Sequence, residues 1–423
     1  MLDRLLILWH FAATRWLPSL GPRIRERRLR RFLAKVHRES PFYAGIEGEW
    51  PILTKREFLD HFGELNRHRF SLEEATAVAL RAERERDFRP ELPGGVTVGL
   101  SSGTSGTRHV FLLGRSERCR WAGQMFARTL APESLKQILN PFAPALRLSF
   151  FLRASSNLYT TLASRRVAFD YYDLTRPFAD LMRELVASPP DVLIAPATVL
   201  VEIARARPAI SPRQILSVAE VLDTRDRAVV EAAFGVSVAE IYQATEGFLG
   251  CSCRAGRIHL NEETLRIEPL WIDESHGRFH PVITDFSRTT QWFVRHRLDD
   301  VLRIDATPCA CGRKTTSIIA IEGRAEEVLW LPDGQGGLTA VFPDTVRQAI
   351  YSLAIPPDRY RIEQHGLRWE VRMSGGDETE IGAALARLVD GFALTKPEIV
   401  FLPWSEQPAA EKQKRIRCLA KPE

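Results

Sequence analysis

The sequence predicts an α/β protein built from two domains. Segments typical of buried strands, such as VTVGL, LRLSFFL, VLIAP and ILSVAEVL, alternate with helical segments over residues 96–260, and this alternation favours a largely parallel sheet flanked by helices. After Gly323 the pattern becomes β-α-β-β-α-β, which indicates a small α+β domain. The chain of 423 residues is long enough for two hydrophobic cores. We expect an N-terminal domain over residues 1–323 and a C-terminal domain over residues 324–423.

The individual elements follow from local periodicity. Residues 1–60 have mainly helical spacing of apolar side chains. Strand-like segments VTVGL and HVFLL flank the polar stretch SSGTSGT at residues 101–107, and VAEIYQATEG and RIHLN are further strand candidates. Helices are expected near residues 115–130, 176–188, 197–206 and 223–234.

The composition is ordinary for a soluble protein, with 45% hydrophobic and 26% charged residues. No segment reaches the roughly 20 uninterrupted apolar residues of a membrane span. Residues 5–13 are apolar, but His10 interrupts the stretch, Arg15 follows it, and we find no signal-peptide cleavage site. We expect an amphipathic helix that docks on the body of the protein, with peripheral membrane association as the alternative, and a cytoplasmic location.

Positive charge is concentrated near the N-terminus. The net charge is +5, yet residues 1–40 alone carry ten Arg or Lys against three acids. In PRIRERRLRRFLAK the arginines alternate with apolar residues at helical spacing. This pattern predicts either a solvated helix face or a landing patch for an acidic partner. No base-reading motif accompanies the charge, so nucleic acid is not expected as a partner.

Four of the six cysteines form two close pairs, Cys251/Cys253 and Cys309/Cys311. Without a secretion signal, close pairs favour a metal site over disulfides. Cys253, His259, Cys309 and Cys311 make a suitable ligand set for tetrahedral Zn²⁺ in a structural site. Buried free thiols are the alternative, and Cys251 could replace Cys253.

The stretch SSGTSGT contains Ser, Gly and Thr only. Glycines allow successive backbone N–H groups to converge on an anion, and the hydroxyls add donors, so we expect a phosphate cradle between two strands. A polar hairpin turn is the alternative. The spacing matches neither the Gly-x-x-x-x-Gly-Lys-Ser/Thr loop nor the Gly-x-Gly-x-x-Gly fingerprint.

Five segments together resemble the adenylate-forming superfamily. SSGTSGT resembles its phosphate loop, YQATEG at 242–247 its Tyr-Gly-x-Thr-Glu block, and RHRLDD at 295–300 its Arg-Tyr-Arg-x-Gly-Asp block. GRAEE at 323–327 is similar to Gly-Arg-x-Asp-Asp, and EKQKRI at 411–416 to the terminal Gly-Lys-x-x-Arg block. The short chain, the segments SPFY and PILTKREF, and PCACGR resemble the phenylacetate–coenzyme A ligase-like branch.

The resemblance implies an ATP-dependent ligase that uses Mg²⁺. In its phosphate loop Thr107 stands where the family has lysine, and Arg108 follows. Glu246 would ligate Mg²⁺, with Thr245 beside the α-phosphate. The resemblance assigns the phosphates to Ser101, Ser102, Gly103, Thr104, Ser105, Gly106, Thr107 and Arg108.

The remaining nucleotide contacts are implied in the same way. Ala219, Glu220 and Tyr242 would line the adenine slot, Asp300 would bind the ribose, and Arg324 the ribose or phosphate. Asp299 replaces a family glycine, which leaves a slip of one residue open.

The small domain would be a mobile lid. It would turn about a hinge at Glu326, where the family usually has aspartate, and carry the catalytic cation Lys412, with Lys414 as the fallback. Glu411 replaces a family glycine beside Lys412.

The substrate expected from this branch is an aromatic carboxylic acid. Ala244 is small and would leave room for a planar ring, while Phe150, Phe151 and Tyr159 could wall the pocket or simply form a buried strand. Coenzyme A or an acyl carrier protein would accept the acyl group. Transfer of AMP to a small molecule and an inactive adenylate-like binding module are the alternatives. The oligomeric state is open, a homodimer included.

Overall fold

The computed structural model describes residues 2–16, 22–100, 109–152, 157–304, 307–405 and 414–422, without the side chains of Asn157, Thr160, Glu326 and Asp344. It divides into two compact units. Unit 1 contains residues 1–271, 281–298 and 304–319, and unit 2 contains residues 272–280, 299–303 and 320–423. The division into domains at residues 323/324 stays a prediction.

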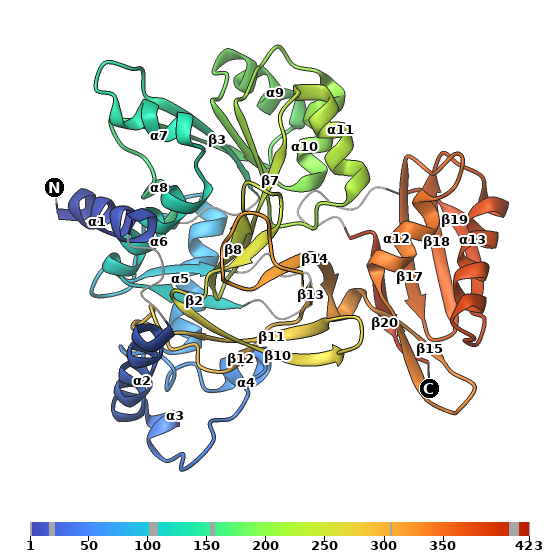
Figure 1. Cartoon of the computed structure of the whole chain (residues 1–423), viewed down its shortest axis with the longest axis horizontal. Helices are drawn as coiled ribbons and strands as arrows, with labels where there is room; N and C mark the ends of the chain where they lie inside the picture. The colour runs from blue at the N-terminus through green and yellow to red at the C-terminus, as the bar shows by residue number, and fades with distance from the viewer. Residues whose placement is uncertain are drawn as a thin grey trace. The chain divides into compact units, whose positions relative to one another are not determined.

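A mixed sheet forms the centre of unit 1, with the strand order β14-β9-β8-β7-β6-β5-β3-β4 (Figure 1). The strands β4, β3, β5, β6 and β7 run parallel to one another, whereas the β7–β8, β8–β9 and β9–β14 pairs are antiparallel. The bounds are β3 Leu146–Leu152, β4 Val167–Asp173, β5 Val192–Ala195, β6 Gln214–Val218, β7 Val238–Ala244, β8 Gly247–Ser252, β9 Ile258–Leu260 and β14 Ser317–Arg324.

Helices cover both faces of the parallel strands, which bury apolar side chains on each side. The bounds are α6 Arg115–Thr129, α7 Pro132–Leu139, α8 Asn157–Thr160, α9 Phe178–Ala187, α10 Ala197–Ala206 and α11 Thr224–Phe234. One core cluster joins α9, α10 and α11 to the sheet, and another joins α6 and α7 to it. Figure 1 shows α10 and α11 on one side of β7 and α6 on the other. The predicted α/β class and the four predicted helices are confirmed.

The N-terminal part of unit 1 is helical, as expected. The bounds are α1 Leu2–Trp16, α2 Pro22–Glu39, α3 Pro41–Ala44, α4 Lys55–Asp60 and α5 Leu72–Glu85. α4 and α5 begin with capping boxes, in which Thr54 and Glu57, and Ser71 and Glu74, exchange hydrogen bonds.

The first helix docks on the body of unit 1, as its amphipathic sequence predicts. Ile7 and Phe11 pack against the core cluster of α6, and Gly123 permits the close approach because a Cβ there would lie 2.6 Å from the Ile7 carbonyl oxygen. Large apolar side chains elsewhere on α1, such as Leu5 and Trp9, are exposed. Within the described chain, no helix has the length and apolarity that crossing a bilayer requires.

Two antiparallel strands bracket the glycine-containing loop. β1 (Thr97–Leu100) and β2 (Val110–Leu113) pair with Leu100 opposite Val110. This confirms the strand–loop–strand arrangement. The loop itself, residues 101–108, lies outside the described residues.

Four further strands contain or adjoin the positions where the chain passes between the units. β10, β11 and β13 contribute residues to both units, as does β14, whose residues from 320 on belong to unit 2. In unit 1, Ile283 of β11 pairs with His296 of β12. The bounds are β10 Leu265–Asp273, β11 Arg278–Asp285, β12 His296–Arg297 and β13 Asp300–Ile304.

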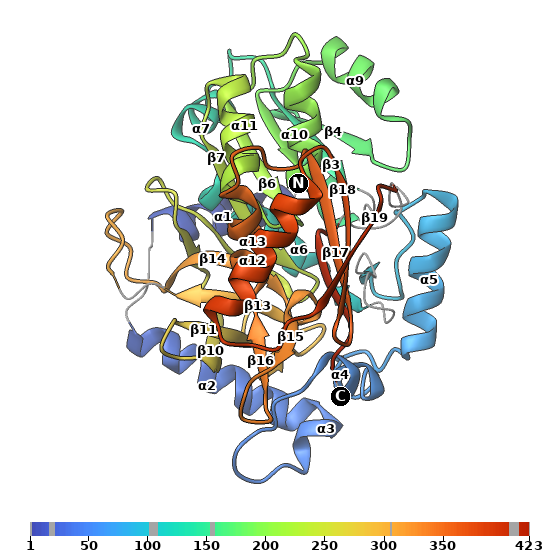
Figure 2. The ribbon, with the colours of Figure 1, turned by 90° about the vertical axis from the view of Figure 1, so that its right-hand side faces the viewer.

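Unit 2 contains a four-stranded sheet in the order β19-β18-β17-β20. Figure 2 shows α12 and α13 on one side of β17 and β18, where Trp369 and Leu385 are fully buried in a shared core. The β-α-β-β-α-β prediction missed the strands β16 and β20. The bounds are η1 Ala325–Glu327, β15 Leu329–Pro332, β16 Leu338–Val341, α12 Pro343–Tyr351, β17 Arg359–His365, β18 Arg368–Ser374, α13 Glu378–Gly391, β19 Glu398–Pro403 and β20 Ile416–Ala420.

Candidate functional site

The base of the glycine-containing loop lies against the Thr-Glu motif. His109 follows the loop directly, and its Nδ1 is 2.6 Å from Glu246 Oε1. Glu246 stands in the turn between β7 and β8. Two segments separated by more than 130 residues therefore meet at one hydrogen bond, as a nucleotide site made from both would require.

Both carboxylate oxygens of Glu246 have partners. His296 Nε2 is 3.5 Å from Oε1, and the Thr245 hydroxyl donates to Oε2 at 2.8 Å. Burial raises the pKa of the Glu246 carboxyl, but the charges and hydrogen bonds of His109 and then His296 outweigh it and hold this pKa well below its usual range. Glu246 is therefore a buried anion held between two imidazoles.

Arg288 binds the backbone of this turn, and the sequence analysis assigned it no role. The buried guanidinium donates to the carbonyl oxygens of Glu246 at 2.9 Å and Leu112 at 2.6 Å, and it lies 4.5 Å from the centroid of the Phe293 ring. Burial lowers the pKa of Arg288, with nearby acids such as Asp285 opposing the shift. The arginine joins the end of β2 to the Thr-Glu turn.

Two of the predicted adenine residues occupy neighbouring positions near the carboxyl ends of adjacent parallel strands. Val218 ends β6 and pairs with Ile241, so Ala219 comes just after β6 and Tyr242 lies near the end of β7, at the edge where α/β sheets bind ligands. Ala219 has φ +65°, an uncommon value for a non-glycine residue. Glu220 Oε2 accepts a 2.7 Å hydrogen bond from the Thr198 hydroxyl. Ala244 ends β7, one residue before Thr245.

The donors around Glu246 fit Mg²⁺ poorly. Mg²⁺ prefers oxygen ligands, whereas the side chains of His109, Glu246 and His296 offer two imidazole nitrogens and one carboxylate, all buried and within 4.8 Å of one another. Mg²⁺ at Glu246 stays a prediction that this donor set does not favour.

In unit 2, the two predicted ribose-binding residues contact each other. Arg324 Nε is 3.4 Å from Asp300 Oδ1, and the Ala325 amide donates to the Asp299 carbonyl at 2.7 Å. The segment with the predicted hinge residue Glu326 therefore packs beside Asp300. The roles of these residues stay predictions.

Several predicted residues lie outside the described part of the chain. Lys412 is one of them, and the side chain of Glu326 is another. Lys414, the fallback for Lys412, is described and buried. The loop residues in this group are Ser101, Ser102, Gly103, Thr104, Ser105, Gly106, Thr107 and Arg108.

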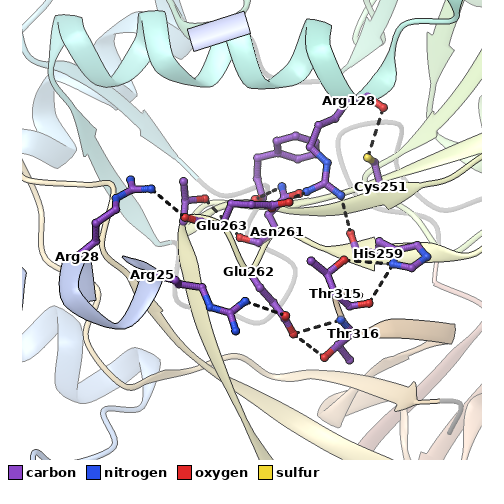
Figure 3. Close-up of polar contacts among 12 residues, drawn as sticks. Arg25, Arg28, Arg128, Cys251, His259, Asn261, Glu262, Glu263, Thr315 and Thr316 are labelled. Atoms are coloured by element: carbon purple, nitrogen blue, oxygen red, sulfur yellow. Dashed lines mark hydrogen bonds and ion pairs between the residues drawn. The ribbon is translucent and has the colours of Figure 1, made fainter. Parts of the chain in front are cut away.

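The predicted zinc ligands come together beside β9, which contains His259. Cys253 Sγ lies 3.6 Å from Cys309 Sγ, Cys311 Sγ lies 3.3 Å from His259 Nε2, and the four ligand atoms are all within 4.8 Å of one another. His259 Nδ1 is 3.0 Å from the Thr315 carbonyl oxygen (Figure 3). A carbonyl only accepts, so Nδ1 carries the proton and Nε2 presents its lone pair to the thiols.

Backbone amides stabilise negative charge on the sulfurs. Ala255 N–H donates to Cys253 Sγ and Arg313 N–H donates to Cys311 Sγ, both at 3.4 Å. Hydrogen bonds from the Cys311 amide and then from His259 lower the pKa of Cys309 to about 6, whereas burial raises that of Cys253. Thiolates are the form that binds metal, so this cluster is chemically suited to Zn²⁺.

Cys251 is not part of the cluster. Its thiol is buried in the core of unit 1 and donates to the Arg128 carbonyl oxygen at 3.7 Å (Figure 3). Burial raises the pKa of Cys251, which favours the neutral thiol. Cys253, rather than Cys251, therefore belongs to the cluster with His259.

The aromatic residues of LRLSFFL form core rather than a pocket wall. Phe151 is fully buried and stacks on Tyr172 at 4.4 Å between ring centroids. Phe150 packs on the opposite side of the strand against Tyr159, at 4.8 Å. Alternation along β3 thus sends the two phenylalanines into two separate core clusters.

The basic helix α2 borders a groove of about 1300 Å³. Apolar side chains such as Leu29 and Phe286 line part of it, and Glu26 and Glu262 pair with some of the arginines. Figure 3 shows Arg25 reaching Glu262 and Arg28 reaching the Glu263 backbone. The arginines that line the groove are Arg23, Arg25, Arg27, Arg30, Arg31 and Arg266.

Comparison with known proteins identifies the fold. No family model matches the chain, and no curated protein matches its sequence. The structure is similar to 2-hydroxyisobutyryl-CoA ligase in the postadenylation state with R3-HIB-AMP, at TM-score 0.61 and 15% identity over 92% of this chain and 87% of the ligase.

Other similar solved structures include two further enzymes. One is the amide bond synthetase McbA from Marinactinospora thermotolerans, at TM-score 0.53 and 10% identity over 76% of this chain and 69% of that one. The other is the anthranilate CoA ligase AuaEII with anthranoyl-AMP, at TM-score 0.50 and 12% identity over 74% and 64%. This chain therefore has the fold of the adenylate-forming ligases.

Proposed function

We propose that the protein activates a carboxylic acid with ATP and transfers the acyl group to a thiol. The hydrogen bond between His109 and Glu246 carries this proposal, because it joins the base of the phosphate-type loop to the Thr-Glu motif at 2.6 Å. The order of the five motifs and the ligase fold support it.

The reaction has two displacement steps. A carboxylate oxygen of the acid attacks the α-phosphorus of ATP, and pyrophosphate leaves with the electrons of the broken P–O bond. The thiol sulfur then attacks the acyl carbon, loses its proton, and AMP leaves. Charge accumulates on phosphoryl oxygens in the first step, so the loop amides and hydroxyls and Lys412 would act by positioning and electrostatics. Rotation of the C-terminal domain about Glu326 would bring Lys412 to the α-phosphate and later remove it.

An aromatic acid is the favoured substrate, as in the phenylacetate–coenzyme A ligase-like branch. Ala244 precedes the Thr-Glu turn and adds little bulk at the carboxyl edge of the sheet. Phe150 and Phe151 do not contribute a wall, since both are buried in core clusters. The anthranilate CoA ligase, whose structure has a similar fold, is known in complex with an aryl adenylate, anthranoyl-AMP.

Pyrophosphate exchange into ATP with a panel of aryl and short aliphatic acids tests the proposal. We expect exchange with at least one aryl acid, loss of exchange in Lys412→Ala, and normal exchange in Lys421→Ala. If Lys414→Ala abolishes exchange and Lys412→Ala does not, the terminal block is shifted by two residues. Lack of exchange with every acid, in protein that binds ATP, would favour an inactive binding module.

The acceptor is coenzyme A or an acyl carrier protein, and the groove beside α2 favours the carrier. Its rim presents several arginines to solvent, including Arg27, Arg30 and Arg31, which suits an acidic protein surface. Replacing Arg27, Arg28, Arg30 and Arg31 by alanine should slow carrier loading about tenfold or more, while sparing exchange. Arg81→Ala on α5 is the control, and equal loss of loading and exchange would reject the docking role.

We also propose a structural Zn²⁺ bound by Cys253, His259, Cys309 and Cys311. The four ligand atoms already lie close together, and the residues come from two turns that the ion would join. One zinc per chain by elemental analysis, lost in Cys309→Ser, is the expected result. Zinc content that Cys309→Ser leaves unchanged would contradict this assignment.

A further inference from the structure

The second cluster of metal-type ligands surrounds Glu246. His109 and His296 are each 1% exposed and Glu246 is 7% exposed. They come from three separate places in unit 1: the start of β2, the β7–β8 turn and β12. Burying two imidazoles with one carboxylate is costly unless their charges are matched, by a shared proton or by a cation.

The geometry is close to that of a coordinated ion. One ligand atom from each residue lies within 4.8 Å of the other two. Two atoms bound to one first-row divalent ion are at most roughly 4.2 Å apart, twice a bond of about 2.1 Å. Small side-chain rotations therefore suffice. A cation between His109 Nδ1 and Glu246 Oε1 would replace the proton that these atoms share at 2.6 Å.

Aromatic side chains enclose the two imidazoles. Phe58 contacts both rings edge-on, at 5.3 Å from His109 and 5.0 Å from His296 between ring centroids. Phe293 stacks on Phe58 at 4.6 Å and also contacts both histidines. These contacts hold the ring planes and exclude water from that side, as the shell of a metal site commonly does.

We propose that His109, Glu246 and His296 form a divalent-cation site that prefers a borderline metal such as Mn²⁺, Co²⁺ or Zn²⁺ over Mg²⁺. Two imidazoles and one carboxylate suit such ions and leave positions open for other ligands. The site itself rests on the geometry alone. Its use in binding nucleotide phosphates rests on the proposed function, through the position of His109 at the end of the phosphate-type loop.

Mn²⁺ is the probe, because thiolates have little preference for it and the Cys253–His259–Cys309–Cys311 cluster can first be filled with one equivalent of Zn²⁺. Pulsed electron paramagnetic resonance then detects coupling between bound Mn²⁺ and imidazole ¹⁴N, in full-length protein without ATP or acid. We expect this coupling in the wild type and in His61→Gln, an exposed control. It should weaken or vanish in His109→Gln and in His296→Gln.

Competition binding supplies the second measurement. Mn²⁺ should bind at least tenfold more tightly than Mg²⁺, and His296→Gln should lose about tenfold or more of the Mn²⁺ affinity. The proposal is overturned if the wild-type protein binds Mn²⁺ without nitrogen coupling, or if it binds no Mn²⁺. Both results come from the wild-type protein, so they do not depend on whether the variants fold. If nitrogen coupling is observed but pyrophosphate exchange is not, the metal site is supported and the adenylation function is rejected. If exchange is observed without coupling, the adenylation function is supported and the metal site is rejected.

Discussion

Two clusters of metal-type ligands among the described residues of unit 1 are built in opposite ways. Cys253, His259, Cys309 and Cys311 stand in or beside two turns, with backbone amides directed at two of the sulfurs. The cluster around Glu246 is enclosed, and the two imidazoles beside its carboxylate come from distant segments. The first cluster could be found from local spacing, and the second could not.

The difference concerns what each cluster can do. Turns that fix cysteines through their own amides can hold a metal as a cross-link, and such a site contributes to folding. A buried carboxylate beside the base of a phosphate-type loop can instead act on a ligand. We therefore expect changes in the cysteine cluster to alter stability, and changes at Glu246 to alter chemistry.

The largest expected effect is that of Glu246→Gln. The change keeps the shape of the side chain and removes the charge that the two histidines face, so pyrophosphate exchange should fall about 10²- to 10³-fold. Glu240→Gln on β7, where the carboxylate pairs with Arg227, is the matched control and should retain exchange. Comparable exchange in Glu246→Gln and Glu240→Gln would remove Glu246 from the active site.

Cys309→Ser should act on stability rather than on chemistry. A cross-link that closes a loop of this length stabilises a domain by about 2–4 kcal/mol, so the melting temperature should fall by roughly 5–15 °C. Exchange measured well below the melting transition should be near normal. Cys418→Ser in unit 2 is the control. A melting temperature that neither Cys309→Ser nor a chelator changes would show that the cluster is not a metal cross-link.

Cys251→Ala separates the cysteine cluster from its neighbour. The buried thiol packs in the core and contacts the Arg128 carbonyl, so its loss should cost about 1 kcal/mol, or roughly 2–4 °C in melting temperature. Zinc content should stay at the wild-type value. Loss of zinc in Cys251→Ala would make Cys251 a ligand and overturn the assignment of Cys253.

The smallest effect concerns His10, a histidine outside both clusters. Burial, followed by the charge of Arg120, lowers the pKa of His10 to about 4. The unfolded chain takes up this proton below about pH 6.5, so wild-type stability should fall relative to His10→Gln between pH 6.5 and 4, and the difference should be constant above pH 6.5. Thermal melting against pH measures it, with His37→Gln as control. A difference that grows above pH 7 instead would contradict the half-buried, neutral state.

Much of the fold was predictable because it is written in local patterns. Period-two and period-3.6 spacing indicated most strands and helices of the parallel sheet, and the strands on either side of SSGTSGT pair as expected. The short strands β16 and β20 were missed. β16 (Leu338–Val341) pairs with β15, and β20 (Ile416–Ala420) pairs with β17. Because such pairing depends on the neighbouring strand, the sequence of each short strand alone gives little indication of it.

The candidate site was predictable only in part. The Thr-Glu motif and the cysteine–histidine set were visible as sequences of suitable residue types. His109, His296 and Arg288 were not assigned any role, because a single histidine or arginine has no meaning until its surroundings are known. The possible aromatic pocket wall of Phe150 and Phe151 proved to be core, since neighbouring strands and helices cover both faces of β3.

By itself the sequence determined the α/β class and the order of the motifs, since these depend on residues close together along the chain. It offered the residues of the cysteine cluster, but the structure decided between Cys251 and Cys253. Only the tertiary structure decided what surrounds Glu246. The two histidines beside that carboxylate lie 137 and 50 residues away along the chain, and they meet because β2, β7 and β12 are positioned by packing. Long-range packing, rather than local preference, therefore sets the charge and the donor set at the centre of the proposed site.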